Sequence, residues 1–228
     1  LPVIPRTQAD CDNPYGALKY HNAVCVGYAT TFRLFMQMLD IPCMVVHNSE
    51  RYHSWDLVQL DGGWYHTDIY SDAGQGDFSH FNLPDVMQMS NQDWNTDFFP
   101  PANRYEYCYV VRNSVEETDL YHIPADLRAA IDERAPMLGL RFGDLSEVDA
   151  QIVEMIMDNV QGRVEYGTYS DQMYMYWNWL PLEQGYLLAV NMNWYDQGGE
   201  DPEPEFPEDA YEKIEEAMEE AFGDMEQQ

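Results

Sequence analysis

The chain has 228 residues, of which 45% are hydrophobic, enough to bury a core in one domain or in one domain with a small second unit. It carries 41 acidic and 11 basic residues, for a formal net charge of −30 at pH 7. Binding to nucleic acid requires clustered lysine and arginine, so we expect no nucleic-acid partner. No apolar run approaches the roughly 18 residues of a transmembrane helix, so we expect no membrane span.

The first predicted regular element is a helix over residues 25–39. Residues 1–13, which contain Pro2 and Pro5, are expected to form an extended lead-in. Residues 14–24 form the approach to the helix, and Asn22 is a candidate cap. Apolar side chains recur every three to four residues after position 25, and the Asp40-Ile41-Pro42 stretch ends the pattern because proline disfavours a continuing helix.

Cys25 stands at the start of this helix. Unpaired backbone N–H groups and the helix dipole favour an anion there, so the pKa of the thiol should fall and its nucleophilicity rise. The alternative is a small buried hydrophobe, which is our interpretation of Cys43 and Cys108. Cys11 is expected to be exposed, and an oxidising compartment would allow it a disulfide, which we do not predict.

Three strands are predicted after the helix. Residues 43–48 form an apolar run, and two β-favouring runs then flank the turn Asp61-Gly62-Gly63, which indicates a hairpin. With a two-residue loop, His53 and Asp68 lie on the same face of the hairpin, one diagonal step apart. A three-residue loop would place them on opposite faces.

Together these residues form a candidate catalytic group: Cys25 as nucleophile, His53 as base and Asp68 as the residue that orients the base. His66 shares the face of Asp68 and is a weaker candidate for the base. A metal site built from Cys25, His53, His66 and Asp68 is the chemical alternative, but no HExxH or paired Cys/His spacing supports it, so we predict no metal.

Four stretches in this order resemble the transglutaminase-like (transglutaminase/protease-like, papain-like cysteine) superfamily. They are Val24-Cys25-Val26-Gly27-Tyr28-Ala29, Leu39-Asp40-Ile41-Pro42, His53-Ser54-Trp55 and Leu60-Asp61-Gly62-Gly63-Trp64-Tyr65-His66-Thr67-Asp68. Residues 15–18 (Tyr-Gly-Ala-Leu) and 81–83 (Phe-Asn-Leu) look like its bacterial branch. The resemblance covers roughly residues 12 to 112.

The resemblance implies an α+β fold with a papain-like core, in which the helix bearing the nucleophile packs on an antiparallel sheet. It carries over a triad of Cys25, His53 and Asp68 for acyl transfer on a peptide or protein amide, as a transglutaminase or as a peptidase or amidase. It implies no cofactor. Trp55 is expected to border the acyl pocket. The alternative is a non-catalytic module that binds peptide or cell-envelope material.

The sequence does not identify the residue that stabilises the oxyanion, because no glutamine precedes the nucleophile. We expect the backbone N–H of Cys25 and one neighbouring donor, with Tyr20 and Asn22 as candidates.

The acidic charge either serves solubility or favours substrates that are basic or carry an amine. The sequence begins at Leu1, which is compatible with a removed leader or lipoprotein anchor. We therefore favour a secreted or cell-envelope protein of a bacterium over a cytoplasmic one.

Three further elements are predicted before residue 112. Residues 71–77 are expected to form a polar turn, with no EF-hand spacing. Residues 86–89 are helix-like. Residues 105–111 alternate tyrosine with other side chains and predict a strand that closes the first sheet.

The composition changes near Arg112, which suggests a catalytic domain over residues 1–112 and a small α+β accessory domain over residues 113–195. The accessory part has an expected ααββ order. Its elements are helices at 124–134 and 145–160 and strands within 162–179 and 186–195. Residues 196–228 are expected to form an acidic linker and a C-terminal helix.

Overall fold

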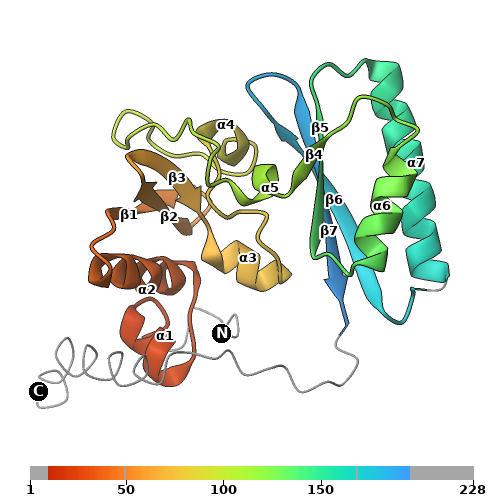
Figure 1. The fold of residues 1–228 in the computed structure, drawn as a ribbon. Helices are drawn as coiled ribbons and strands as arrows, with labels where there is room; N and C mark the ends of the chain where they lie inside the picture. Colours follow the sequence, from red (N-terminus) through yellow and green to blue (C-terminus); the bar gives the residue numbers. More distant parts are fainter. Residues whose placement is uncertain (1–9, 49, 168, 196–228) are drawn as a thin grey trace, which may run out of the picture. The chain divides into compact units, whose positions relative to one another are not determined.

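The computed structural model describes residues 10–48, 50–167 and 169–195 (Figure 1). These residues lie in one compact unit that ends at Tyr195. The predicted acidic tail and most of the predicted lead-in lie outside the described residues. No described helix has the length and apolarity needed to cross a membrane.

The N-terminal region contains two helices, a small antiparallel sheet and a third helix. Its helices are α1 (Pro14–Tyr20), α2 (Cys25–Met38) and α3 (Ile69–Gln75), and its strands are β1 (Cys43–Asn48), β2 (His53–Leu60) and β3 (Gly63–Thr67). The strands pair in the order β1-β2-β3. Helix α2 packs on this sheet, and one hydrophobic cluster lies around the buried side chains of Val46, Trp55 and Leu57 (Figure 1).

The C-terminal region is built on a second sheet. The elements from residue 85 onward are α4 (Asp85–Gln88), α5 (Tyr109–Arg112), β4 (Ser114–Glu116), α6 (Ile123–Asp132), β5 (Met137–Phe142), α7 (Glu147–Tyr166), β6 (Met173–Pro181) and β7 (Tyr186–Trp194). The strand order is β4-β5-β7-β6, with β4 parallel to β5 and the other pairs antiparallel.

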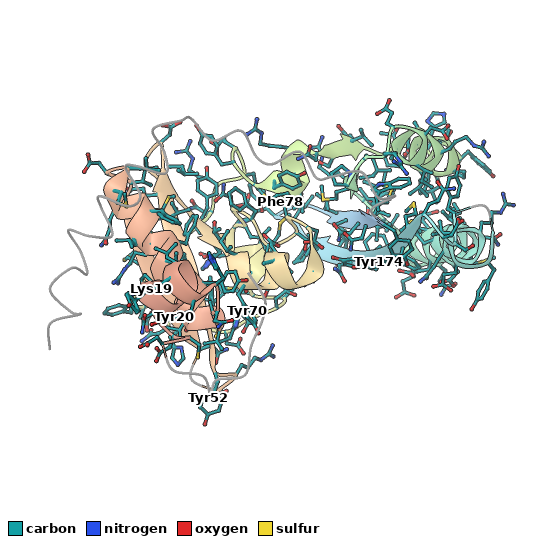
Figure 2. The ribbon with its side chains drawn as sticks, turned by 90° about the horizontal axis from the view of Figure 1, so that it is seen from below. Lys19, Tyr20, Tyr52, Tyr70, Phe78 and Tyr174 are labelled. Carbon is teal, nitrogen blue, oxygen red and sulfur yellow. The ribbon has the colours of Figure 1, made fainter. Side chains whose placement is uncertain are left out.

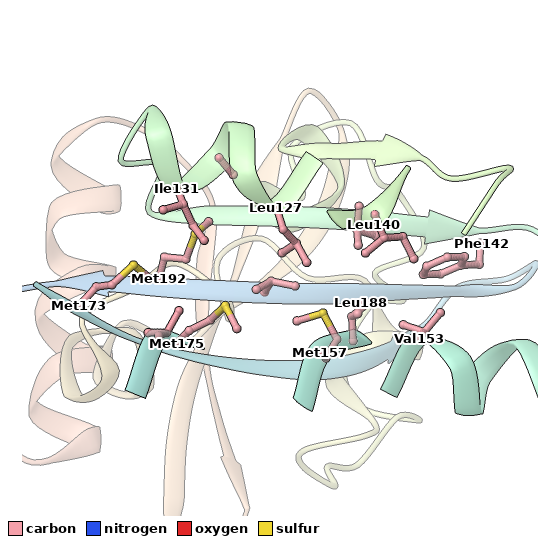
Figure 3. Close-up of a cluster of buried hydrophobic side chains, with 14 residues drawn as sticks. Leu127, Ile131, Leu140, Phe142, Val153, Met157, Met173, Met175, Leu188 and Met192 are labelled. Atoms are coloured by element: carbon pink, nitrogen blue, oxygen red, sulfur yellow. The ribbon is translucent and has the colours of Figure 1, made fainter. Parts of the chain in front are cut away.

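Helices α6 and α7 cover one face of the second sheet (Figure 1). Leucine, valine and methionine side chains fill the space between them, among them Leu127, Val153, Met157 and Leu188, which are all at most 1% exposed (Figure 3). Alternating residues of β7 face this cluster, as expected for a strand with one side against helices.

The predicted α+β class is confirmed, and so are the principal elements around the candidate site. The nucleophile helix runs over Cys25–Met38 and the first strand over Cys43–Asn48, as predicted. The hairpin loop has two residues, because Leu60 pairs with Gly63. In the C-terminal region α6 and the start of α7 also agree, and the Ser146 hydroxyl caps α7 by accepting from the Asp149 N–H.

Two predictions in the middle of the chain are wrong. Residues 105–111 form a turn followed by α5, so the first sheet ends at β3. The alternating tyrosines reflect separate contacts around this turn: Tyr107 donates to the Asp61 carboxylate, whereas the Tyr105 hydroxyl accepts from the Glu183 N–H. Residues 71–77 are mostly helical, because the Asp68 side chain caps α3.

The ααββ order is also wrong, because strands β4 and β5 were not predicted and helix α7 continues to Tyr166. Strand β5 carries Gly139, where an added Cβ would lie 2.5 Å from the Ser114 Cβ. A glycine within an apolar run here marks the close approach of β4.

Cys11 was expected to be exposed and is instead buried, at 3% exposed. Its carbonyl oxygen accepts from the Val24 N–H at 2.8 Å. A Cβ at Gly27 would lie 2.4 Å from that same oxygen, so this close packing requires glycine at the first turn of α2. The four cysteines are thiols and not disulfides, with Cys108 fully buried and Cys43 half-buried.

Candidate active site

Cys25 is the first residue of α2 and is 5% exposed. The N-cap is Val24, without a side-chain hydrogen bond, so the predicted capping role of Asn22 is wrong. The backbone N–H of Asn22 instead bonds to the Gly16 carbonyl at 3.3 Å. Because the cap position offers no side-chain acceptor, the positive end of the helix dipole acts on Cys25 without a competing cap.

The Cys25 sulfur lies against the loop that leads into β2. It is 3.7 Å from the Tyr52 carbonyl oxygen, which accepts the S–H of the protonated thiol. Tyr52 adopts a left-handed backbone conformation with φ 52°, which turns the chain into His53. Figure 2 shows the Tyr52 side chain projecting from this loop, and it is 68% exposed. The sulfur and the imidazole therefore approach each other across a short, sharply turned segment.

His53, the first residue of β2, interacts with both Asp68 and Cys25. Its Nε2 lies 2.6 Å from Asp68 Oδ2. Burial alone would lower the pKa of His53, but hydrogen bonds to Asp68 and to Cys25 and the negative charges of both raise it to about 9. Because Nε2 of His53 bonds to Asp68, Nδ1 is the ring nitrogen that remains for the interaction with the Cys25 sulfur. At neutral pH the arrangement favours an imidazolium beside a thiolate.

Two aromatic rings hold the imidazole of His53 in place. The Trp55 ring is stacked against it, with ring centroids 5.9 Å apart and an interplanar angle of 20°. The Tyr70 ring lies 5.9 Å away at a tilted angle and contacts Tyr28 of α2 edge-on. These contacts link the orientation of the imidazole to the helix that carries the cysteine.

Asp68 links the hairpin to α3. Its carboxylate caps the helix by accepting from the Ser71 N–H at 3.0 Å and from the Ser71 hydroxyl at 2.8 Å. Its own N–H bonds to the His80 carbonyl at 3.1 Å. Burial would raise the pKa of Asp68, but the hydrogen bond and charge of His53 and the bonds from Ser71 lower it below its usual range. Asp68 is therefore a fixed carboxylate anion behind the imidazole.

A second buried histidine–aspartate pair lies behind Trp55. The indole Nε1–H donates to His66 Nδ1 at 2.9 Å, and His66 Nε2 lies 2.8 Å from Asp85 Oδ1. The other oxygen of Asp85 accepts from the Ala102 N–H at 3.1 Å. His66 has no exposed area, and burial lowers its pKa. His66 thus supports Trp55 and lies outside the Cys25–His53 contact.

One cluster of potential metal ligands occurs in the described part of the chain. Asp72, Asp77 and His80 present ligand atoms within 4.8 Å of one another. Asp72 Oδ1 lies 3.0 Å from His80 Nδ1 and accepts from the His80 N–H at 2.8 Å, while Asp77 accepts from Ser79. These bonds fix the loop whose His80 carbonyl holds Asp68, so we treat the cluster as structural support for the site.

The three predicted substrate contacts lie in different settings. Trp55 is 1% exposed beneath His53, which favours support of the imidazole over direct contact with a substrate. Tyr20 ends α1, is 50% exposed and lies on the same approach segment as the half-buried Asn22 (Figure 2). Their contact with a substrate or with an oxyanion remains a prediction.

Several contributors to the site were not predicted from sequence. The Tyr52 carbonyl and the His80 carbonyl act through the main chain, which no residue type signals. Asp85 and Ser71 act through side chains. The Asp68-x-x-Ser71 spacing is a readable helix-capping signal, whereas Asp85 meets His66 only through the tertiary fold.

Comparison with known proteins gives one family match. The sequence model of the transglutaminase-like superfamily matches residues 4–69, a stretch that contains Cys25, His53 and Asp68. No curated protein matches the chain. The narrower assignment to a bacterial branch stays a prediction. The match identifies residues 4–69 of this chain as a region of the transglutaminase-like superfamily.

Proposed function

We propose that the chain is a cysteine-dependent acyl-transfer enzyme that acts on a peptide or protein amide. In this proposal Cys25 is the nucleophile, His53 the general acid and base, and Asp68 the residue that orients His53. The observation that carries the proposal is the position of His53, which bonds to Asp68 at 2.6 Å and interacts with Cys25 through a hydrogen bond. The superfamily match to residues 4–69 supports the same chemistry.

In the first step the Cys25 thiolate attacks the amide carbonyl carbon and forms a C–S bond. The C–N bond of the resulting tetrahedral intermediate then breaks, and the leaving nitrogen takes a proton from the His53 imidazolium. The products are a thioester on Cys25, a released amine or ammonia, and neutral His53.

In the second step an amine or a water molecule attacks the thioester carbonyl. His53 removes the proton from the attacking group, and the C–S bond breaks to restore the Cys25 thiolate and the imidazolium. Asp68 stabilises the imidazolium and fixes the ring tautomer. The negative charge that develops on the carbonyl oxygen is stabilised by hydrogen bonds from the Cys25 N–H and from one neighbouring donor, with Tyr20 and Asn22 as candidates.

The group that attacks the thioester distinguishes the two kinds of enzyme: an amine makes the reaction that of a transglutaminase, and water makes it that of a peptidase or amidase. The net charge of −30 supports a basic or amine-bearing partner, because long-range attraction raises its local concentration. We propose that residues 1–112 carry the chemistry and that residues 113–195 are an accessory unit. A secreted or cell-envelope location in a bacterium fits an acyl-transfer role on proteins, with a cytoplasmic location as the alternative.

The direct test offers the protein a glutamine-containing peptide together with a fluorescent primary amine. Incorporation of the amine indicates a transferase, and release of ammonia or free acid alone indicates a hydrolase. Cys25→Ala should abolish either activity, whereas Cys43→Ala, which removes a thiol outside the site, should retain it. Turnover by Cys25→Ala close to that of the unchanged protein would end the proposal.

The second candidate is a binding module that keeps the fold without catalysis. An interacting cysteine, histidine and aspartate would have no use in such a module, which favours the enzyme. A peptide that binds without amine incorporation, ammonia release or hydrolysis, together with a Cys25 that alkylates no faster than a free thiol, would favour the module.

A further inference from the structure

Helices α6 and α7 leave an apolar groove on the C-terminal region. The groove has a volume of about 510 Å³ and is lined mainly by aliphatic side chains of both helices. On α7, Met155 is 68% exposed and Ile152 is 40% exposed, whereas the deeper Val164 is buried. Large apolar side chains exposed together beside a groove are typical of a binding surface.

The charge of this groove is opposite to that of the chain. Arg128 of α6 and Arg163 of α7 line it, one on each helix, and no Asp or Glu lines it. The whole chain has 41 acidic and 11 basic residues. Among the described residues neither arginine forms an ion pair. Two exposed guanidinium groups therefore face the groove with no anionic partner in the described structure.

The dimensions of the groove fit a helix. The α7 side of the groove runs from Ile152 to Val164, which is about 18 Å at 1.5 Å per residue. A helix laid along this length would present three apolar side chains at i, i+4 and i+7 to the groove. Carboxylates on either flank of such a helix would meet Arg128 on one side and Arg163 on the other.

We propose that the groove between α6 and α7 binds an amphipathic helix whose apolar stripe is flanked by acidic side chains. Aliphatic contacts supply the affinity, and the two arginines select acidic over basic partners. Repulsion from the distant acidic residues of the chain is screened over about 8 Å at physiological ionic strength, whereas the arginine contacts are local. This proposal is independent of the acyl-transfer site.

The test measures fluorescence anisotropy of a labelled helical peptide of about 18 residues with leucines at i, i+4 and i+7 and flanking glutamates. A matched peptide carries lysine in place of each glutamate. We expect the glutamate peptide to bind the full chain and the lysine peptide to bind at least about tenfold more weakly. The combined change Arg128→Gln and Arg163→Gln should weaken the glutamate peptide about tenfold, since each exposed charge pair contributes modestly.

Two further variants complete the design. Met155→Asn should weaken binding by placing an uncharged polar group in the apolar groove, and Arg112→Gln, an exposed arginine outside the groove, should leave it unchanged. Circular dichroism confirms that each variant is folded. Equal binding of both peptides, no binding of the glutamate peptide, or an unchanged affinity in the double arginine variant would each overturn the proposal. Self-association that Met155→Asn abolishes would identify a second copy as the occupant and would overturn it as well.

Discussion

Trp55 donates its indole N–H to Nδ1 of His66 at 2.9 Å. Tryptophan is only a donor, so Nδ1 of His66 must be the acceptor, and its hydrogen is on Nε2, which faces Asp85 Oδ1 at 2.8 Å. His66 is therefore a neutral, tautomerically fixed residue that holds the ring on which His53 stacks. We infer that His66 is a positioning residue for the proposed base His53.

Replacing His66 separates this role from a general effect on folding. A glutamine accepts from Trp55 through its carbonyl and donates to Asp85 through its NH₂ group, whereas alanine leaves the buried Trp55 N–H without an acceptor and removes one donor from the partly exposed Asp85 carboxylate. We expect His66→Ala to reduce stability by about 2 kcal/mol and His66→Gln by less. In an acyl-transfer assay His66→Ala should lower kcat about tenfold with little change in KM, and His66→Gln should recover most of the loss. A glutamine variant as impaired as the alanine variant would contradict the positioning role.

The burial of Asp56 leads us to expect an unusual dependence of the free energy of unfolding on pH. It is 1% exposed, its Oδ1 accepts from Cys43 at 3.5 Å, and burial raises its pKa to about 8. The folded state therefore keeps a proton on Asp56 that the unfolded state releases near pH 4. The free energy of unfolding then decreases as the pH rises from about 4 towards 8, because the unfolded state is favoured by losing this proton. Asparagine has no such proton. We expect Asp56→Asn to gain stability over the unchanged protein as pH rises from 4 to 8, by on the order of 5 kcal/mol.

Denaturant titrations at several pH values measure this difference. Asp158→Asn, which removes an exposed carboxylate from α7, is the matched control and should show a nearly constant difference. A stability difference for Asp56→Asn that does not grow with pH would mean that Asp56 is ionised in the folded protein.

Asp68→Asn should change the titration of His53. Burial alone would lower the pKa of His53, but hydrogen bonds to Asp68 and Cys25 and the charges of both raise it to about 9. Removal of the Asp68 carboxylate should therefore lower that pKa, which NMR of the imidazole protons measures. The pair stabilises the fold most strongly between the ordinary carboxyl pKa of 3.8 and the ordinary imidazole pKa of 6.5. The Asp68 contribution is lost as the pH falls through the lowered pKa of Asp68, and the His53 contribution is lost as the pH rises through about 9. Acyl transfer should fall by at least about a hundredfold, because the tautomer of His53 is no longer fixed. An unchanged titration would remove Asp68 from the site.

The sequence predicted the elements around the candidate site better than the rest of the fold. Cys25, His53 and Asp68 were brought together as candidates because of strong local signals: a helix start and two strands joined by a two-residue turn, both of which the structure has. Their catalytic roles stay a prediction. The loop length alone decided that His53 and Asp68 share a face. A one-residue error there would have separated them.

The remaining structure depends on contacts between distant segments. Tyr105 and Tyr107 alternate like strand residues, yet their hydroxyls bond to Glu183 and Asp61 on opposite sides of a turn. Strand β5 is short and contains Gly139, so its pattern predicts little until β4 is placed beside it. Trp55 was expected to border the acyl pocket because it follows His53 in sequence, and this role stays a prediction. Its bond to His66 could not be predicted, because it depends on the pairing of the two strands and on side-chain direction.

The most direct test of the central claim is the rate at which iodoacetamide alkylates Cys25 between pH 6 and 9, with each product located by mass spectrometry. If Cys25 and His53 form a thiolate–imidazolium pair, alkylation should be fast and nearly constant from pH 6.5 to 8, and His53→Ala should slow it about tenfold or more near neutral pH. A rate for the unchanged protein that rises through pH 8.5 like that of a free thiol, and that His53→Ala does not alter, would contradict the account.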